Sequence, residues 1–176
     1  MTLTEYFDTP ETVLPQELAY GIWHVAEAPS ASHQRVVLKL AMALEAHAGP
    51  RGLGEVFIAP IDVVLDADRA LVVQPDLLFV ANDRSGLVID RIYGAPDLVV
   101  EVLSPDPRVG RLEERVGWFA KYGVREVWLY EQSERRLDLL RCEGGRVVAR
   151  RRFERWDRIQ SDVLPDFDRT MAAILG

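Results

Sequence analysis

Residues 97–105 read Asp-Leu-Val-Val-Glu-Val-Leu-Ser-Pro, an apolar run with one carboxylate at its centre, Glu101. Such a run, bounded by turn residues, is typical of a strand that is buried on both faces. A carboxylate inside a buried strand costs free energy unless a metal ion or hydrogen-bonding partners surround it. A second apolar run, residues 77–80, directly follows Asp76. Two core strands that each carry one acid are the first indication of a functional site.

Two long helices are predicted from the spacing of apolar residues. Residues 33–47 have the helical period, with Ser32 as a suitable N-cap and Gly49-Pro50 at the end. Residues 108–122 also have the helical period, and Gly123 follows as the expected C-cap. Arginines border the apolar face of this second helix, at Arg108, Arg111 and Arg115.

The rest of the pattern favours strands. We expect strands over residues 20–25, 55–59, 62–65, 70–73, 77–80, 98–103 and 125–130, and a hairpin of residues 135–140 and 146–153. A short helix capped by Thr2 or Thr4, a helical turn over 11–18, a polar loop over 82–95 and a terminal helix over 169–175 complete the prediction. The basic run 150–152 is interpreted as an exposed strand end. The fold class is therefore α/β (α+β), with a mixed sheet flanked by helices.

Length and composition limit the class of protein. A chain of 176 residues suits a single domain over 1–176, and one cysteine excludes a disulfide framework or a cysteine-rich zinc site. We find no membrane span or signal peptide in the sequence and expect a cytoplasmic location. The net charge of −7 argues against broad attraction to nucleic acid but leaves room for a local basic patch.

The spacing around Glu101 lacks one part of a common nuclease motif. Residues two apart in a strand share a face, so Glu101 and Leu103 point the same way. In the Glu-x-Lys motif of metal-dependent nucleases, a lysine at the second position helps to position or deprotonate water. Leucine can do neither.

Several fragments together resemble the Uma-two family of restriction-endonuclease-like proteins. They are Glu-Leu-x-x-Gly at 17–21, Ser-His-Gln-Arg at 32–35, Gln-Pro-Asp-Leu-Leu-Phe-Val at 74–80, Pro-Asp-Leu-Val-Val-Glu-Val-Leu-Ser-Pro at 96–105, and Tyr-Gly-Val-x-Glu-x-Trp at 122–128. They occur in the family's order over nearly the whole chain, and Leu-Pro-x-Phe at 164–167 also fits. The resemblance implies a PD-(D/E)xK nuclease core, in which a central mixed sheet flanked by helices, with extra hairpins, holds a divalent ion.

The resemblance also implies roles for individual residues. Asp76 and Glu101 match the metal-binding acids, the Val102 carbonyl is the expected third ligand, and Glu17 matches an early acid near the ion. The ion would be Mg²⁺ or Mn²⁺, which prefer oxygen ligands. Arg115 stands where members of the family place a lysine; it keeps the charge but is a poor proton acceptor.

The arginines on the second helix give the expected contact with DNA. Arg115 would clamp the scissile phosphate, and Arg108 and Arg111 would extend that contact along the backbone. Arg111 aligns with a position where the family has an acid. By analogy with nucleases that cut both strands, we expect a homodimer.

Each assignment has a structural alternative. Asp76 would then only begin a strand, Glu101 would be ion-paired with Arg115, Glu17 would be a solvated acid, and the arginines would border a solvated helix face. His33 is interpreted as a capping or packing residue. At the level of function, a metal-dependent DNA endonuclease competes with an inactive nuclease-fold module that binds nucleic acid or a protein, and with a purely structural pair of acids.

Overall fold

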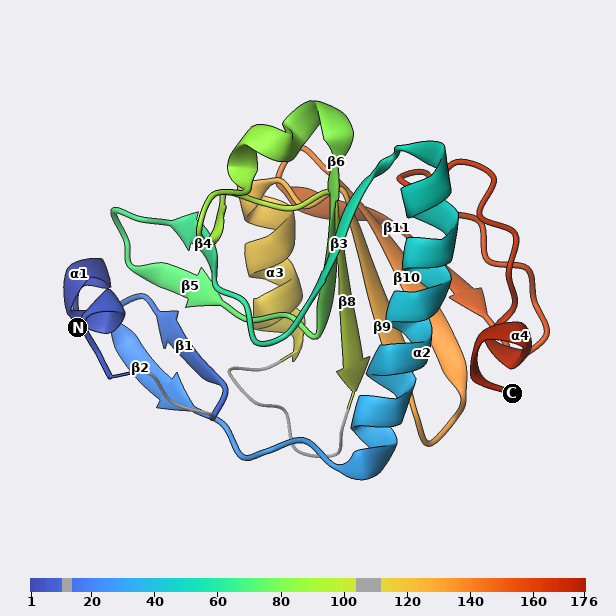
Figure 1. Cartoon of the computed structure of the whole chain (residues 1–176), viewed down its shortest axis with the longest axis horizontal. Coiled ribbons are helices and arrows are strands. Elements are labelled where there is room, and N and C mark those ends of the chain that lie inside the picture. The colour runs from blue at the N-terminus through green and yellow to red at the C-terminus, as the bar shows by residue number, and fades with distance from the viewer. Residues whose placement is uncertain (11–13, 104–111) are drawn as a thin grey trace.

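A six-stranded mixed sheet forms the centre of the molecule in the computed structural model, which describes residues 1–10, 14–103 and 112–176 (Figure 1). The strand order is β11-β10-β9-β8-β6-β3. The strands are β3 (Gly54–Ile58), β6 (Leu77–Ala81), β8 (Leu98–Leu103), β9 (Glu126–Glu131), β10 (Arg136–Glu143) and β11 (Arg146–Phe153). This large sheet is the mixed sheet that the sequence predicts.

The central strand β8 has the expected bounds and is covered on both faces. It pairs in parallel with β9 and antiparallel with β6. Leu98, Val100 and Val102 pack into one buried cluster, whereas Val99 packs into the cluster on the other face. The alternation of a strand therefore places Glu101 on the same face as Val99.

Asp97 fixes the beginning of β8. Its carboxylate is fully buried, accepts a hydrogen bond from the Ala81 amide at 2.8 Å, and pairs with Arg84 at 3.0 Å. The end of β6 is thereby held against the start of β8. This acid stabilises the sheet at the end opposite to Glu101.

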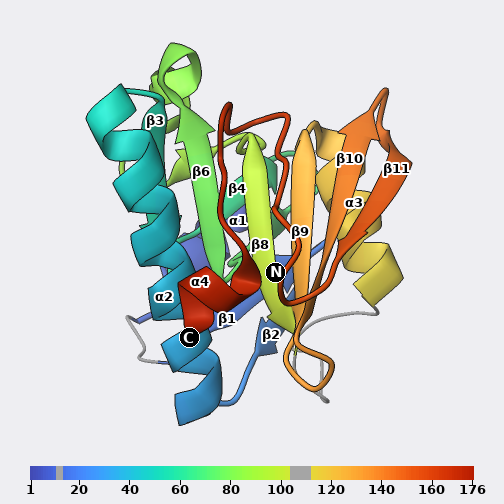
Figure 2. The same ribbon diagram turned by 90° about the vertical axis from the view of Figure 1, so that its right-hand side faces the viewer.

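Helices α2 and α4 cover one face of the large sheet (Figure 2). The helix α2 (Ala31–Ala48) begins earlier than predicted, because Ser30 rather than Ser32 is its N-cap and accepts from the His33 amide at 3.2 Å. The helix α4 (Met171–Leu175) is capped by Thr170 and packs beside α2. Within the described residues, none of the helices combines the length and the apolar character needed to cross a membrane.

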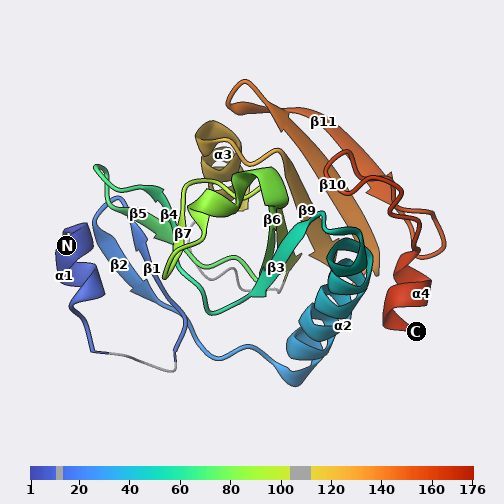
Figure 3. The same ribbon diagram turned by 45° about the horizontal axis from the view of Figure 1, so that its top comes forward.

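A second sheet of five described strands, in the order β2-β1-β5-β4-β7, lies beyond α3 (Leu112–Tyr122) (Figures 1 and 3). Its strands are β1 (Gln16–Ala19), β2 (Ile22–Val25), β4 (Val63–Asp66), β5 (Leu71–Val73) and β7 (Ile92–Tyr93). The helix α1 (Leu3–Phe7) packs on its outer face through Tyr6, and Thr2 with Glu5 forms a capping box at its start. Side chains of α3, including Phe119, join the two sheets in one buried cluster.

Two predicted segments are wrong. Residues 16–18, expected in a helical turn, belong to strand β1, because Leu18 and Ala19 are buried by pairing with β5 and by packing. The expected loop 82–95 contains the short helix η2 (Asn82–Leu87) and strand β7. A further short helix, η1 (Gly49–Arg51), follows α2. Residues 11–13 and 108–111 of the predicted elements lie outside the described residues.

Strand β11 forms one edge of the large sheet and carries the basic run. Arg150, Arg151 and Arg152 lie within the strand rather than at an exposed end. Asp138 on the neighbouring strand β10 accepts from Arg150 at 2.6 Å and from Arg152 at 3.0 Å. Burial acts to raise the pKa of Asp138, but the hydrogen bonds and charges of Arg150 and Arg152 outweigh it and lower that pKa.

We predict that Gly54→Ala destabilises the protein by about 1–3 kcal/mol, as overpacking does. Gly54 begins β3 at φ +155, and a Cβ there would lie 2.1 Å from the Val80 carbonyl oxygen. Gly117→Ala is the matched control, because Gly117 lies on the exposed side of α3 with no atom within 4 Å of an added Cβ. Urea unfolding should show the control unchanged or more stable by up to about 1 kcal/mol. Equal midpoints for the two variants would contradict this packing.

Candidate functional site

The register of the large sheet brings Asp76 next to the end of β8. Strands β6 and β8 pair Leu77 with Val100, and β6 begins there, so the Val102 amide has no strand partner on that side. The carboxylate of Asp76 takes that place and accepts from the Val102 amide at 2.8 Å. Asp76 is only 3% exposed. The acid therefore extends the sheet with its side chain.

His33 contacts the other oxygen of the same carboxylate. Its Nε2 lies 3.0 Å from Asp76 Oδ1, and both side chains are buried. The first turn of α2 places the histidine there. His33 is thus neither a simple cap nor a simple packing residue, and its contact with Asp76 is not evident from the sequence. The only signal for it was the Ser-His-Gln-Arg fragment of the family resemblance.

Arg115 on α3 binds two acids from two different sheets. Its Nη1 and Nη2 donate to the two oxygens of Glu17, each at 2.8 Å, and its Nε donates to Glu101 Oε1 at 2.7 Å. Nη2 also approaches the Gln74 carbonyl at 3.4 Å. Every nitrogen of this buried guanidinium thus donates to a protein oxygen. Arg115, Glu17 and Glu101 meet as one group.

Gln74 lies where the chain crosses from the small sheet to the large one, and it contacts the group formed by Arg115, Glu17 and Glu101. It follows β5 and precedes Asp76. Its backbone amide donates to Glu17 Oε1 at 2.5 Å, and its side-chain Nε2 donates to Asp62 at 2.9 Å. Glu17 is 4% exposed on β1, so the alternative of a solvated acid is wrong.

The site carries more negative than positive charge. Burial raises the pKa of Glu101 to about 7; the charges of Asp76 and Glu17 add to this effect, and Arg115 opposes it. Burial by itself lowers the pKa of Arg115, but Glu101 and Glu17 raise it well above its ordinary value. The guanidinium remains protonated and is shared by the carboxyl groups of Glu17 and Glu101.

The oxygen atoms here suit a hard divalent cation. Among the described residues Oε2 of Glu101 accepts no hydrogen bond, and a cation beside it would relieve the repulsion between Glu101 and Asp76. No group of three His, Cys, Asp or Glu side chains in the described part of the chain is arranged to hold a metal. Mg²⁺ and Mn²⁺ fit such a set better than Zn²⁺, because Mg²⁺ is usually held by one or two carboxylates and keeps several waters.

The structure therefore brings together four of the predicted site residues, Asp76, Glu101, Glu17 and Arg115. The predicted ion pair between Glu101 and Arg115 is present at 2.7 Å. Leu103, in the place of the motif lysine, packs against the core between the sheets. The metal-ligand role of the Val102 carbonyl stays a prediction, and Arg108 and Arg111 lie outside the described residues.

Comparisons with known proteins agree with this architecture. Residues 3–172 match the model of the family Uma2, described as "Putative restriction endonuclease". The fold is similar to a crystal structure from Anabaena variabilis, titled "a putative nuclease belonging to DUF820", with a TM-score of 0.82 and 17% sequence identity. The match covers 99% of this chain and 97% of the other. No curated protein matches the sequence.

We predict that metal-free protein loses stability as the pH rises from about 4.5 to 7, relative to Glu101→Gln. The raised pKa means that the folded state binds the Glu101 proton more tightly than the unfolded chain does, so the free energy of unfolding falls when that proton leaves. The difference between the two proteins should change by a few kcal/mol over this range. Urea unfolding with a chelator at several pH values measures it. Parallel pH curves would contradict the raised pKa.

Proposed function

The chain belongs to the Uma2 family, and on that basis we propose that it is a metal-dependent endonuclease that hydrolyses DNA phosphodiester bonds. The family and the nuclease-like fold support a nuclease. The observation that carries the finer proposal is the convergence of Asp76 and Glu101 at the ends of two adjacent core strands, with Oε2 of Glu101 unpartnered among the described residues. An acid pair of this kind is the part of the site that metal-assisted hydrolysis requires.

In this proposal each side chain has a separate task. Mg²⁺ or Mn²⁺, held by Asp76, Glu101 and the Val102 carbonyl, would supply an activated water and offset charge on the phosphate. The Val102 amide and His33 hold the Asp76 carboxylate in one orientation. The guanidinium of Arg115 holds Glu101 on one side and Glu17 on the other.

Arg115 acts mainly as an organising residue in this scheme. Its nitrogens already donate to Glu17, Glu101 and the Gln74 carbonyl, which leaves little donor capacity for a scissile phosphate. Its raised pKa also makes it a poor proton acceptor. We therefore propose an attenuated enzyme, in which arginine preserves the geometry of the acids and omits the proton transfer that a lysine supplies.

A catalytically inactive nuclease-fold module is the second candidate. The observation that favours it is the same Arg115, because the guanidinium neutralises charge that a divalent cation would otherwise offset. Leu103 offers no replacement for the missing lysine. Such a module would bind nucleic acid or a protein without cutting.

The proposal also covers the domain organisation, the location and the oligomeric state of the protein. We propose one domain over residues 1–176, a cytoplasmic location and a homodimer as the active form. The homodimer rests on analogy with nucleases that cut both strands.

We predict that purified protein with Mn²⁺ nicks supercoiled plasmid and that Glu101→Gln lowers the rate by about a hundredfold or more. The substitution keeps the shape of the side chain but removes the charge proposed to hold the ion. Glu114→Gln is the matched control, because Glu114 is an exposed acid on the same helix as Arg115. A chelator should abolish nicking. Equal rates for wild type and Glu101→Gln would refute the proposed site.

We predict that Arg115→Lys raises nicking per folded molecule by about tenfold or more while lowering stability. A lysine restores a group able to exchange a proton, but one ammonium cannot reproduce the paired hydrogen bonds to Glu17. Plasmid nicking and urea unfolding give the two readouts, and calorimetry with Mn²⁺ shows whether each protein binds the ion. If both proteins bind Mn²⁺ and neither nicks DNA, the inactive module is the correct function.

A further inference from the structure

A cavity of about 240 Å³ is lined by three arginines from three distant parts of the chain. Arg35 comes from the first turns of α2, Arg135 from the turn between β9 and β10, and Arg155 from the segment after β11. Ser32 and Gln132 also line the cavity. The first turn of α2 and the turn between β9 and β10 lie at the same end of the molecule (Figures 1 and 2).

The cavity lies near the end of β8, on the face of the large sheet that α2 and α4 cover. Ser32 directly precedes His33, whose side chain contacts Asp76. Tyr130, another lining residue, pairs with Val102 in the parallel register of β8 and β9. Gln132 donates to the Leu103 carbonyl at 3.1 Å. The three arginines therefore lie near the end of β8, on the face of the large sheet opposite to the one that carries Glu101.

No Asp or Glu side chain in the described part of the chain offsets the charge of these arginines. Among the described residues, neither Arg35, Arg135 nor Arg155 forms an ion pair. Arg35 and Arg135 are exposed, and Arg155 donates to the Gly176 carbonyl at 3.1 Å. In a chain with a net charge of −7, such a cluster creates a local attraction for anions.

We propose that Arg35, Arg135 and Arg155 bind the phosphodiester backbone of the nucleic acid where it passes the end of β8, away from the bond to be cut. The inference rests on the proposed nuclease function and deepens it. Guanidinium groups match phosphate oxygens with paired hydrogen bonds, and contacts with successive phosphates fix the register of a strand without reading its sequence. This assigns backbone binding to α2 and the β9–β10 turn.

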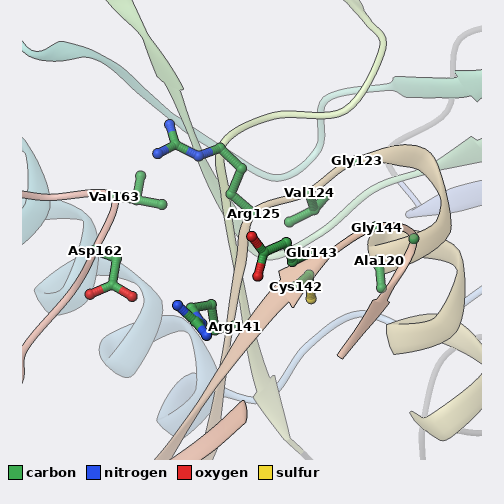
Figure 4. A pocket seen from close by; sticks show the side chains of 11 residues that line it. Ala120, Gly123, Val124, Arg125, Arg141, Cys142, Glu143, Gly144, Asp162 and Val163 are labelled. Atoms are coloured by element: carbon green, nitrogen blue, oxygen red, sulfur yellow. The ribbon is translucent and has the colours of Figure 1, made fainter. Parts of the chain in front are cut away.

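A second cavity provides the comparison. It has a volume of about 400 Å³ and is lined by Arg125 and Arg141 together with Glu143 and Asp162 (Figure 4). It lies at the opposite end of β9, next to Val124. Its mixed charge makes it a poor site for a polyanion. Arg141 and Arg146 are exposed and, among the described residues, without ion pairs, so they match Arg35 and Arg135 in charge and exposure.

The test compares two double variants, Arg35→Gln with Arg135→Gln, and Arg141→Gln with Arg146→Gln. Binding of a fluorescent DNA duplex is measured by anisotropy with Ca²⁺ in place of Mn²⁺, from about 50 to 200 mM salt. We expect the first variant to bind about a hundredfold more weakly, for duplexes of any sequence, and the slope of log K against log salt to fall in magnitude by about two. The second variant should bind as the wild type does, and urea midpoints confirm that both fold.

The possible results distinguish failure of the proposed phosphate site from failure of the proposed nuclease activity. If the first variant binds with wild-type affinity and salt slope, or if the wild type does not bind DNA, the phosphate site is refuted. Equal losses in both variants would also refute it, since they would show only an effect of net charge. A wild type that binds through these arginines but never nicks plasmid would overturn the endonuclease and leave the site intact.

Discussion

Through its guanidinium, Arg115 links helix α3 to both the small sheet and the large sheet. It projects from α3 and donates to Glu17 on the small sheet and to Glu101 on the large sheet. A buried cation of this kind is tolerated only when its donors are satisfied, and here each nitrogen has an acceptor. Loss of either acid would leave charge unpaired in the interior. The relative position of the two sheets and the arrangement of the acids therefore depend on the same ion pairs.

Much of the fold follows from local patterns in the sequence. Strand β8 is an apolar run that turn-forming residues bound in the sequence, and its burial on both faces is what that pattern predicts. Strand β1 was missed because four residues with only two apolar side chains show no clear period. Its extended conformation comes from pairing with β5 and β2, partners that lie elsewhere in the sequence.

Most residues of the candidate site could be predicted from the sequence, whereas many of their contacts could not. Asp76 and Glu101 follow from apolar strands with single acids, and Glu17 and Arg115 from the family resemblance. The orientation of Arg115 was not predictable, since 98 residues separate it from Glu17 and a helical arginine has several possible partners. His33 and the cluster of Arg35, Arg135 and Arg155 were missed for a related reason. Residues that meet only through the fold leave no spacing that a sequence pattern could detect.

The edge strand β11 also limits how copies of this chain can associate. An unpaired edge offers a row of amides and carbonyls to which a strand of another molecule can add. On β11 that edge carries Arg146, Arg150, Arg151 and Arg152, and Asp138 holds two of them in place. A second copy approaching edge to edge would bring four more arginines against these. Like-charge repulsion, reduced by the ion pairs with Asp138 and Asp162, thus disfavours extension of the large sheet at this edge.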